Sequence, residues 1–236
     1  IGSSFPLHDG GFFYVMVRDL LKNDLLLPAY SSFNNANIPF IYPPFGLYFV
    51  AILERIFDID GVLLFKIIPF VLVILLIPVF YEFSKEFFEN ENYSLTATLV
   101  FSLLPFSYEW LILGGGVTRG FGAIFCLLSL TFLFRNIKRT NIPNSILCVL
   151  FCGLTVLSHP EWAWFIVYSI GLKLLLMFLK NKRKALIISV ITFFGTLLVV
   201  SPWLIAIFDK HRWTIVRPFF ESGFSRWAQI MNLLAF

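Results

Sequence analysis

Long apolar runs separated by short polar segments constrain this chain more than any other feature of its sequence. An α-helix rises about 1.5 Å per residue, so roughly 20 apolar residues are needed to cross a hydrocarbon layer about 30 Å thick. Six runs come close to that length, and we predict that each forms a membrane-spanning helix. They cover residues 62–81, 93–113, 117–134, 142–158, 161–179 and 185–208.

The composition favours the same interpretation. Hydrophobic residues make up 58% of the chain and charged residues only 14%, whereas soluble domains are about a quarter charged. The 30 phenylalanines bring more apolar surface than a soluble fold of 236 residues can bury, so a lipid bilayer is the expected environment. We predict an all-α, polytopic transmembrane helical bundle with surface helices in the first extracytoplasmic loop.

Two other kinds of site are not indicated. The net charge of +4 comes from short loops between apolar runs, so we expect no nucleic-acid partner. The cysteines, Cys126, Cys148 and Cys152, lie inside apolar runs without metal-binding or disulfide spacing. We interpret them as small buried hydrophobic residues and predict no metal site from them.

The chain divides into four parts. Residues 1–61 form the first extracytoplasmic loop with interfacial helices, residues 62–208 the six-span bundle, residues 209–229 a second extracytoplasmic loop, and residues 230–236 the start of a further span. The chain opens at Ile1 without a signal peptide and stops inside an apolar run, so we expect it to be an internal fragment of a longer protein.

Lysine and arginine in short loops predict the orientation. The loops at residues 135–139 and 180–184 are strongly basic, as cytoplasmic loops are. Alternation then places residues 1–61, 114–118, 158–161 and 209–228 outside, in a multi-pass plasma-membrane protein whose active site faces the extracytoplasmic side. The outer loop also carries bases, mixed with acidic residues and a histidine, which indicates a binding surface.

Scarce ionisable residues gather on that predicted outer side. His8, His159, His211 and Arg119 all fall there, although neutral residues could have closed each apolar hairpin. Ionisable groups that face one leaflet mark a candidate cavity. Arg119 follows three glycines; it is either a phosphate ligand or a snorkelling arginine beside a flexible turn. His159 and Glu161 either line the floor of a cavity or simply flank a proline turn.

The first loop contains two helix signals. Apolar residues recur at helical spacing after Asp9, which predicts an amphipathic helix lying on the membrane surface with its apolar face down. Asp9 is either the cap of that helix or a general base or metal ligand at the membrane edge. The polar, aromatic loop before residue 45, with Tyr42-Pro43-Pro44, either binds a sugar or head group or forms an aromatic belt. Residues 45–57 are too few to cross the membrane and predict an interfacial or re-entrant helix.

The order of these motifs resembles the GT-C superfamily of membrane glycosyltransferases, most closely proteins similar to glycosyltransferase family 39. That group includes protein mannosyltransferases and the aminoarabinose transferase of lipid A. The matching residues are Asp9, Phe13, Arg18 and Asp19; Tyr42-Pro43-Pro44-Phe45-Gly46-Leu47-Tyr48; Lys66-Ile-Ile-Pro69; and Ser201-Pro202-Trp203. The chain departs from the family at Gly10, where an acidic residue is usual, and at Ser158-His159-Pro160-Glu161.

The resemblance implies a polyprenyl-phosphate-linked sugar donor and a lipid, glycan or protein acceptor. It assigns the role of catalytic base to Asp9. We expect Arg119, Arg212, Arg217 and His211 to bind the donor phosphate, because such a leaving group needs cations. We expect His8, Tyr42, His159 and Glu161 to contact substrate. A divalent metal is compatible with the resemblance, but no residue pattern requires one.

The alternative function is non-catalytic. A GT-C-like membrane protein that lacks transferase activity could act as a lipid or polymer transport subunit or as a structural subunit. Arg212, Arg217 and His211 would then belong to a solvated interfacial loop. A separation of more than about 20 Å between Asp9, Arg119 and His159 would favour this alternative, because the proposed chemistry needs them in one pocket.

Overall fold

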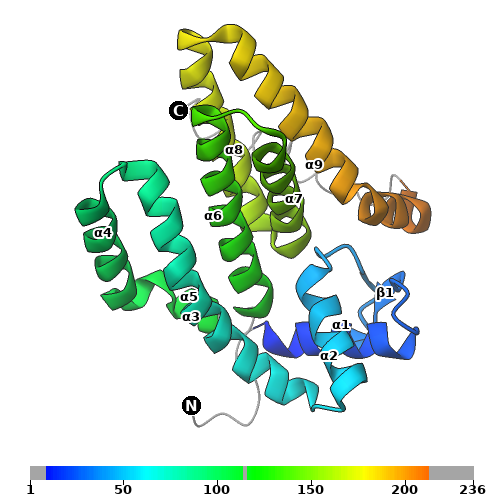
Figure 1. Ribbon diagram of the computed structural model, residues 1–236. Coiled ribbons are helices and arrows are strands. Elements are labelled where there is room, and N and C mark those ends of the chain that lie inside the picture. Colours follow the sequence, from blue (N-terminus) through cyan, green and yellow to red (C-terminus); the bar gives the residue numbers. More distant parts are fainter. Residues whose placement is uncertain (1–8, 114–115, 213–236) are drawn as a thin grey trace, which may run out of the picture.

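The computed structural model of the chain describes residues 9–113 and 116–212 (Figure 1). Helices dominate it, as predicted, and one two-stranded antiparallel sheet is present in the described part. The α-helices are α1 (Gly10–Lys22), α2 (Phe45–Phe57), α3 (Gly61–Phe88), α4 (Glu91–Leu103), α5 (Glu109–Ile112), α6 (Gly116–Lys138), α7 (Ile142–Ser158), α8 (Pro160–Lys180) and α9 (Lys182–His211). The strands are β1 (Tyr30–Ser31) and β2 (Ile38–Pro39), and short 3-10 helices cover Phe33–Asn35 and Pro105–Ser107.

Four of these helices, α3, α6, α8 and α9, are long and apolar enough to cross a membrane. Helix α7 is apolar but shorter, with 17 residues. Helix α6 is the central helix, because 78% of its most apolar window is buried inside the protein, against 17% for α8 and 22% for α9. The outer faces of α8 and α9 therefore present large apolar side chains to their surroundings, as lipid-facing helices do.

The predicted span at residues 93–113 is wrong as a single helix. Helix α4 ends at Leu103, and a 3-10 turn and the short helix α5 follow before α6 begins. Pro105 explains the break: its ring disfavours helical backbone at the preceding residue, and Leu104 is extended with φ −87° and ψ 110°. Hydropathy alone does not reveal this break in the helix, because the residues on both sides of Pro105 are apolar.

The bundle has two chemically different ends. At the end that we name the basic end, Arg135 and Lys138 of α6 pair with Glu86 of α3 at 2.8 and 2.9 Å. There Lys184 of α9 also donates to the carbonyl oxygen of Ile137. The other end, which we name the α1 end, holds α1, α2 and the sheet, and α3, α6 and α8 begin there (Figure 1).

Helix α1 lies across the α1 end (Figure 1). Its apolar face is covered by other parts of the protein. Met16, Val17 and Leu20 are fully buried in a core shared with α2 and α3. The expectation that this face lies on lipid is therefore wrong, because the protein itself buries it. An ion pair between Arg18 and Glu54 joins α1 to α2.

Asp19 holds the sheet against α1. Its buried carboxylate accepts hydrogen bonds from the hydroxyl groups of Ser31 and Ser32 and from the backbone N–H of Ser32, at 3.0, 2.6 and 2.8 Å. A buried carboxylate is stable only when its oxygens are satisfied in this way. The aspartate thus fixes the loop that precedes Tyr42.

Candidate functional site

The predicted base and the predicted phosphate ligand are in direct contact. Asp9 immediately precedes α1, Arg119 lies in the first turn of α6, and Oδ2 of Asp9 is 3.0 Å from a terminal nitrogen of Arg119. The carboxylate makes no capping hydrogen bond to α1, so the interpretation of Asp9 as a simple cap is wrong. Its side chain is 56% exposed, whereas that of Arg119 is 6% exposed. The pair therefore has an open side at Asp9.

Arg119 is enclosed rather than snorkelling toward water. Its guanidinium lies over the ring of Trp110, 4.1 Å from the centroid, and one terminal nitrogen is 3.5 Å from the Trp110 carbonyl oxygen. Within the described ranges its Nε–H has no hydrogen-bond acceptor. Cation–π contact and an ion pair both stabilise a charge in such a site.

The close approach of α5 to α6 puts Trp110 in place. A Cβ on Gly116 would lie 2.1 Å from the carbonyl oxygen of Leu111, so only glycine fits at the start of α6. Neither Trp110 nor Thr118 was among the residues predicted for the site. Trp110 fell inside a predicted span, where an aromatic residue near a membrane surface carries no special signal.

Tyr42 joins this cluster from the loop before α2. Its hydroxyl is 3.2 Å from Oγ1 of Thr118, the neighbour of Arg119, and its ring packs against Phe13 with centroids 4.8 Å apart. Burial is the main reason that the pKa of Tyr42 rises to about 12. The phenol is therefore neutral and can donate a hydrogen bond at physiological pH.

His159 faces Tyr42 from the turn between α7 and α8, with ring centroids 6.2 Å apart. Burial, followed by the positive charge of Arg119, lowers its pKa to about 4, although Asp9 opposes the shift. Nδ1 accepts the backbone N–H of Glu161 at 3.2 Å, so the proton of the neutral ring lies on Nε2. The carboxylate of Glu161 is 4.0 Å from Nδ1, but with a neutral ring this contact is not an ion pair.

Gly122 makes room for that histidine. A Cβ on Gly122 would lie 3.1 Å from Cβ of His159 and 2.7 Å from Cδ1 of Trp162. A larger residue would therefore push the start of α8 away from α6. The small residue lets the turn that carries His159 pack close to α6, where the charge of Arg119 lowers the pKa of the histidine.

A groove of about 990 Å³ adjoins the cluster, between the Tyr42 loop and the facing ends of α8 and α9. Its walls are mainly apolar and aromatic, and its polar members include Tyr42, Asp209 and Arg212. Such cavities, apolar with a few placed polar groups, are typical of binding sites. Arg212, one of the predicted phosphate ligands, therefore lines the groove.

His211 is placed differently from the prediction. It is buried, and its ring meets that of Tyr30 edge-on with centroids 5.2 Å apart. The neighbouring Lys210 donates to the carbonyl oxygen of Leu27. These contacts attach the end of α9 to the loop before β1, so His211 has a structural role that the sequence did not indicate. His8 and Arg217 lie outside the described residues.

The structure thus unites Asp9, Arg119, Tyr42 and His159, with Glu161 at the edge and Arg212 in the adjoining groove. Within residues 9–113 and 116–212, no group of three His, Cys, Asp or Glu residues is arranged to hold a metal ion. Comparisons with protein-family models, with curated proteins and with solved structures found no match. The roles of these residues are therefore argued from their geometry and chemistry.

Proposed function

We propose that the protein is an integral membrane glycosyltransferase that moves a sugar from a polyprenyl-phosphate donor to an acceptor on the extracytoplasmic side. The contact between Asp9 and Arg119 carries this proposal. These residues are 110 positions apart in the chain, and their charged atoms are 3.0 Å apart. Glycosyl transfer needs a base at the acceptor hydroxyl and a cation at the leaving phosphate, and the two would be adjacent here.

The chemistry is a substitution at the anomeric carbon. The acceptor hydroxyl forms a bond to that carbon, its proton passes to Asp9, and the bond from the carbon to the phosphate oxygen breaks. The phosphate leaves with an additional negative charge, which Arg119 stabilises. Because Arg119 is buried beside Trp110, its attraction for that charge is stronger than it would be in water.

The ion pair between Asp9 and Arg119 requires the donor to bind before Asp9 can act as a base. A terminal nitrogen of Arg119 that donates to Asp9 is not available to a phosphate in the same geometry. An arriving phosphate competes for the guanidinium and releases the Asp9 carboxylate toward the acceptor. The base is thus unmasked only after the donor has bound, which limits transfer to water before the acceptor arrives.

Two neutral groups complete the site. The phenol of Tyr42 and Nε2–H of His159 can each donate a hydrogen bond to a sugar without adding charge. A cationic histidine here would compete with Arg119 for the phosphate. The low pKa of His159 therefore supports a site with one dominant cation for the leaving group.

The substitution Asp9→Asn tests the proposal. We expect transfer of labelled sugar from a polyprenyl-phosphate donor to fall about 10²- to 10⁴-fold, the usual contribution of a general base. Folding and donor binding should persist, because the amide keeps the shape of the carboxylate. Asp24→Asn is the matched control, since Asp24 is 86% exposed and pairs with Arg55 rather than Arg119. Full activity of the Asp9→Asn protein would rule the proposal out.

A further inference from the structure

A lysine lies within the apolar length of α8. Lys173 precedes Lys180, the last residue of α8, and every residue between them is apolar. At about 1.5 Å per residue, the backbone of Lys173 is about 10 Å from that end of the helix. A lysine charge among hydrocarbon chains is costly unless a polar or anionic partner is within reach. The position of Lys173 therefore calls for such a partner.

The group that Lys173 contacts in the structure is an aromatic ring. Its Nζ is 4.2 Å from the centroid of the ring of Phe134 on α6, and that ring packs against Phe83 and Phe87 of α3. Among residues 9–113 and 116–212, no carboxylate forms an ion pair with Lys173. The face of a ring attracts an ammonium group, but it has no net charge that could neutralise it. The described part of the chain therefore supplies no anion to this lysine.

The acidic residues of α3 at the basic end are already paired with α6. Glu82 and Glu86 each lie 2.8 Å from a nitrogen of Arg135. Glu86 and Glu89 lie 2.9 and 3.0 Å from Nζ of Lys138. The acids of α3 therefore neutralise cations of α6, and none of these three carboxylates is paired with a cation of α8 or α9.

The turn between α8 and α9 is basic and contains no acidic residue. Lys180, Lys182 and Arg183 are exposed there, and within the described ranges none of them forms an ion pair. Lys184 donates to the carbonyl oxygen of Ile137, which holds this turn next to the end of α6. Three exposed cations without a carboxylate partner therefore lie at the end of the bundle toward which the recessed lysine is placed.

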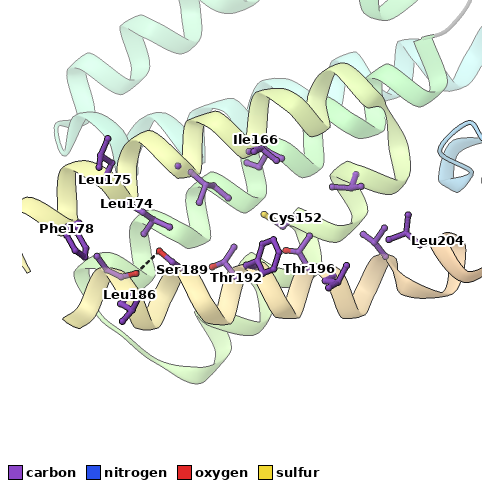
Figure 2. Close-up of a pocket in the computed structure, with 18 of the residues that line it drawn as sticks. Cys152, Ile166, Leu174, Leu175, Phe178, Leu186, Ser189, Thr192, Thr196 and Leu204 are labelled. Atoms are coloured by element: carbon purple, nitrogen blue, oxygen red, sulfur yellow. Dashed lines mark hydrogen bonds between the residues drawn. The ribbon is translucent and has the colours of Figure 1, made fainter. Parts of the chain in front are cut away.

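The lysines of α8 lie on a different face from the apolar crevice between α8 and α9. That crevice, of about 750 Å³, is lined on α8 by apolar residues that include Leu174 and Phe178 (Figure 2). Lys173 and Lys180 do not line it. Residues seven positions apart share one face of a helix, and the contact with Phe134 places this face toward α6. Helix α8 therefore has one apolar face and one face that carries two cations.

We propose that the face of α8 that carries Lys173 and Lys180 binds the phosphate of an anionic phospholipid from the leaflet at the basic end. The phosphate pairs with Lys173 beside Phe134, and the cations of the α8–α9 turn add to the attraction. A lipid supplies a phosphate at this depth among apolar side chains, whereas a soluble phosphate stays in water. A single carboxylate of another membrane helix would neutralise one of these cations, whereas a leaflet of anionic lipids neutralises all of them.

Native mass spectrometry of the purified full chain in detergent tests the proposal. The affinities for dioleoyl phosphatidylglycerol and dioleoyl phosphatidylcholine, which differ in head-group charge but not in their chains, are measured, and the wild-type protein should prefer the phosphatidylglycerol. Lys173→Met should lower the ratio of the two affinities about fivefold, the usual value of one lysine near an anionic membrane surface. Lys173→Arg keeps the charge and should keep the ratio. Inorganic phosphate should not displace bound phosphatidylglycerol.

Two controls separate this site from general effects of charge and of the crevice. Lys66→Met removes a lysine of α3 that also lies inside a membrane-length helix, but near its start at the α1 end, and should leave the ratio unchanged. Gly171→Phe adds a ring to the crevice without changing the charge of the protein, and should also leave the ratio unchanged.

Equal affinities of the wild-type protein for the two lipids, or equal effects of Lys173→Met and Lys66→Met, would overturn the proposal. Displacement of the lipid by inorganic phosphate would also overturn it. An unchanged ratio in the Lys173→Met protein would do the same and would leave a carboxylate of another membrane helix as the partner of Lys173. None of these outcomes bears on glycosyl transfer, because Asp9 lies at the α1 end and Lys173 near the basic end.

Discussion

The guanidinium of Arg119 is positively charged and buried. Asp9, Trp110 and His159 all interact with that charge. Asp9 neutralises it on one side and the ring of Trp110 lies against its face. The same charge helps to keep His159 neutral. One residue thus accounts for the ion pair, the stacked ring and the protonation state of the histidine.

His159 gives the site a measurable pH dependence. Its folded pKa of about 4 lies below the ordinary value of 6.5, so between these pH values the unfolded chain binds a proton that the folded protein does not. The histidine therefore contributes its full stability above pH 6.5, and this contribution is lost as the pH falls toward 4. The difference is of the order of 3 kcal/mol, at 1.36 kcal/mol per unit of pKa.

Thermal unfolding in detergent between pH 4 and pH 7.5 checks this prediction. The unfolding midpoint of the wild-type protein should fall more steeply below pH 6.5 than that of the His159→Gln variant, which cannot titrate at this position. Parallel curves for the two proteins would show that His159 titrates with an ordinary pKa in the folded state.

Single residues also show how far the sequence could predict the site. Arg119 and His159 were singled out because ionisable side chains that close apolar hairpins need a reason to be there. Asp9 and Tyr42 were singled out by their motifs in the first loop, Asp9 before a helix and Tyr42 before two prolines. Trp110 was not, because its role depends on the break at Pro105, which turns α5 over Arg119. The contact between His211 and Tyr30 could not be predicted from the sequence either, because it joins segments far apart in the chain.

At the scale of elements, small residues set how closely α7 and α9 pack. A Cβ on Gly153 of α7 would lie 2.3 Å from a methyl carbon of Val199, and one on Gly195 of α9 would lie 2.6 Å from a methyl carbon of Val149. Helices in membranes associate through such close backbone approaches, because lipid supplies no hydrophobic force between them. The glycines of α7 and α9 therefore have a packing role that Gly171 of α8 does not have.

The substitution Gly153→Val should destabilise the protein by about 1–3 kcal/mol, the usual result of overpacking. The measurement is the midpoint of thermal unfolding in detergent. Gly171→Ala is the matched control and should leave the midpoint unchanged or raise it, because its Cβ meets open space. An equal loss of stability in both variants would contradict this account of the packing.

Helix positions show where sequence reasoning succeeded among the elements. The expected spans at residues 62–81, 117–134, 161–179 and 185–208 each fall inside one long apolar helix. The span at residues 93–113 failed because a hydropathy average does not weigh Pro105 against its apolar neighbours. The apolar face of α1 was identified correctly, but periodicity cannot tell lipid from a protein partner.

At the scale of the whole molecule, one end of the bundle holds contacts between helices and the other end holds the candidate site. At the basic end, Arg135, Lys138 and Lys184 are engaged in contacts that tie α3, α6 and α9 together. At the α1 end, the pair of Asp9 and Arg119 lies beside Tyr42, and Tyr42 lines the groove. The groove and the candidate site residues therefore lie at the same end of the molecule.

We propose that Asp9 and Arg119 act as one unit in glycosyl transfer. The direct measurement is the rate of transfer from a polyprenyl-phosphate sugar for Asp9→Asn, for Arg119→Gln and for the double variant. Each single substitution should lower the rate about 10²-fold or more, and the double variant should be no slower than the slower single variant, because residues that act as a unit are not additive. Losses that multiply in the double variant, or full activity in either single variant, would contradict the account.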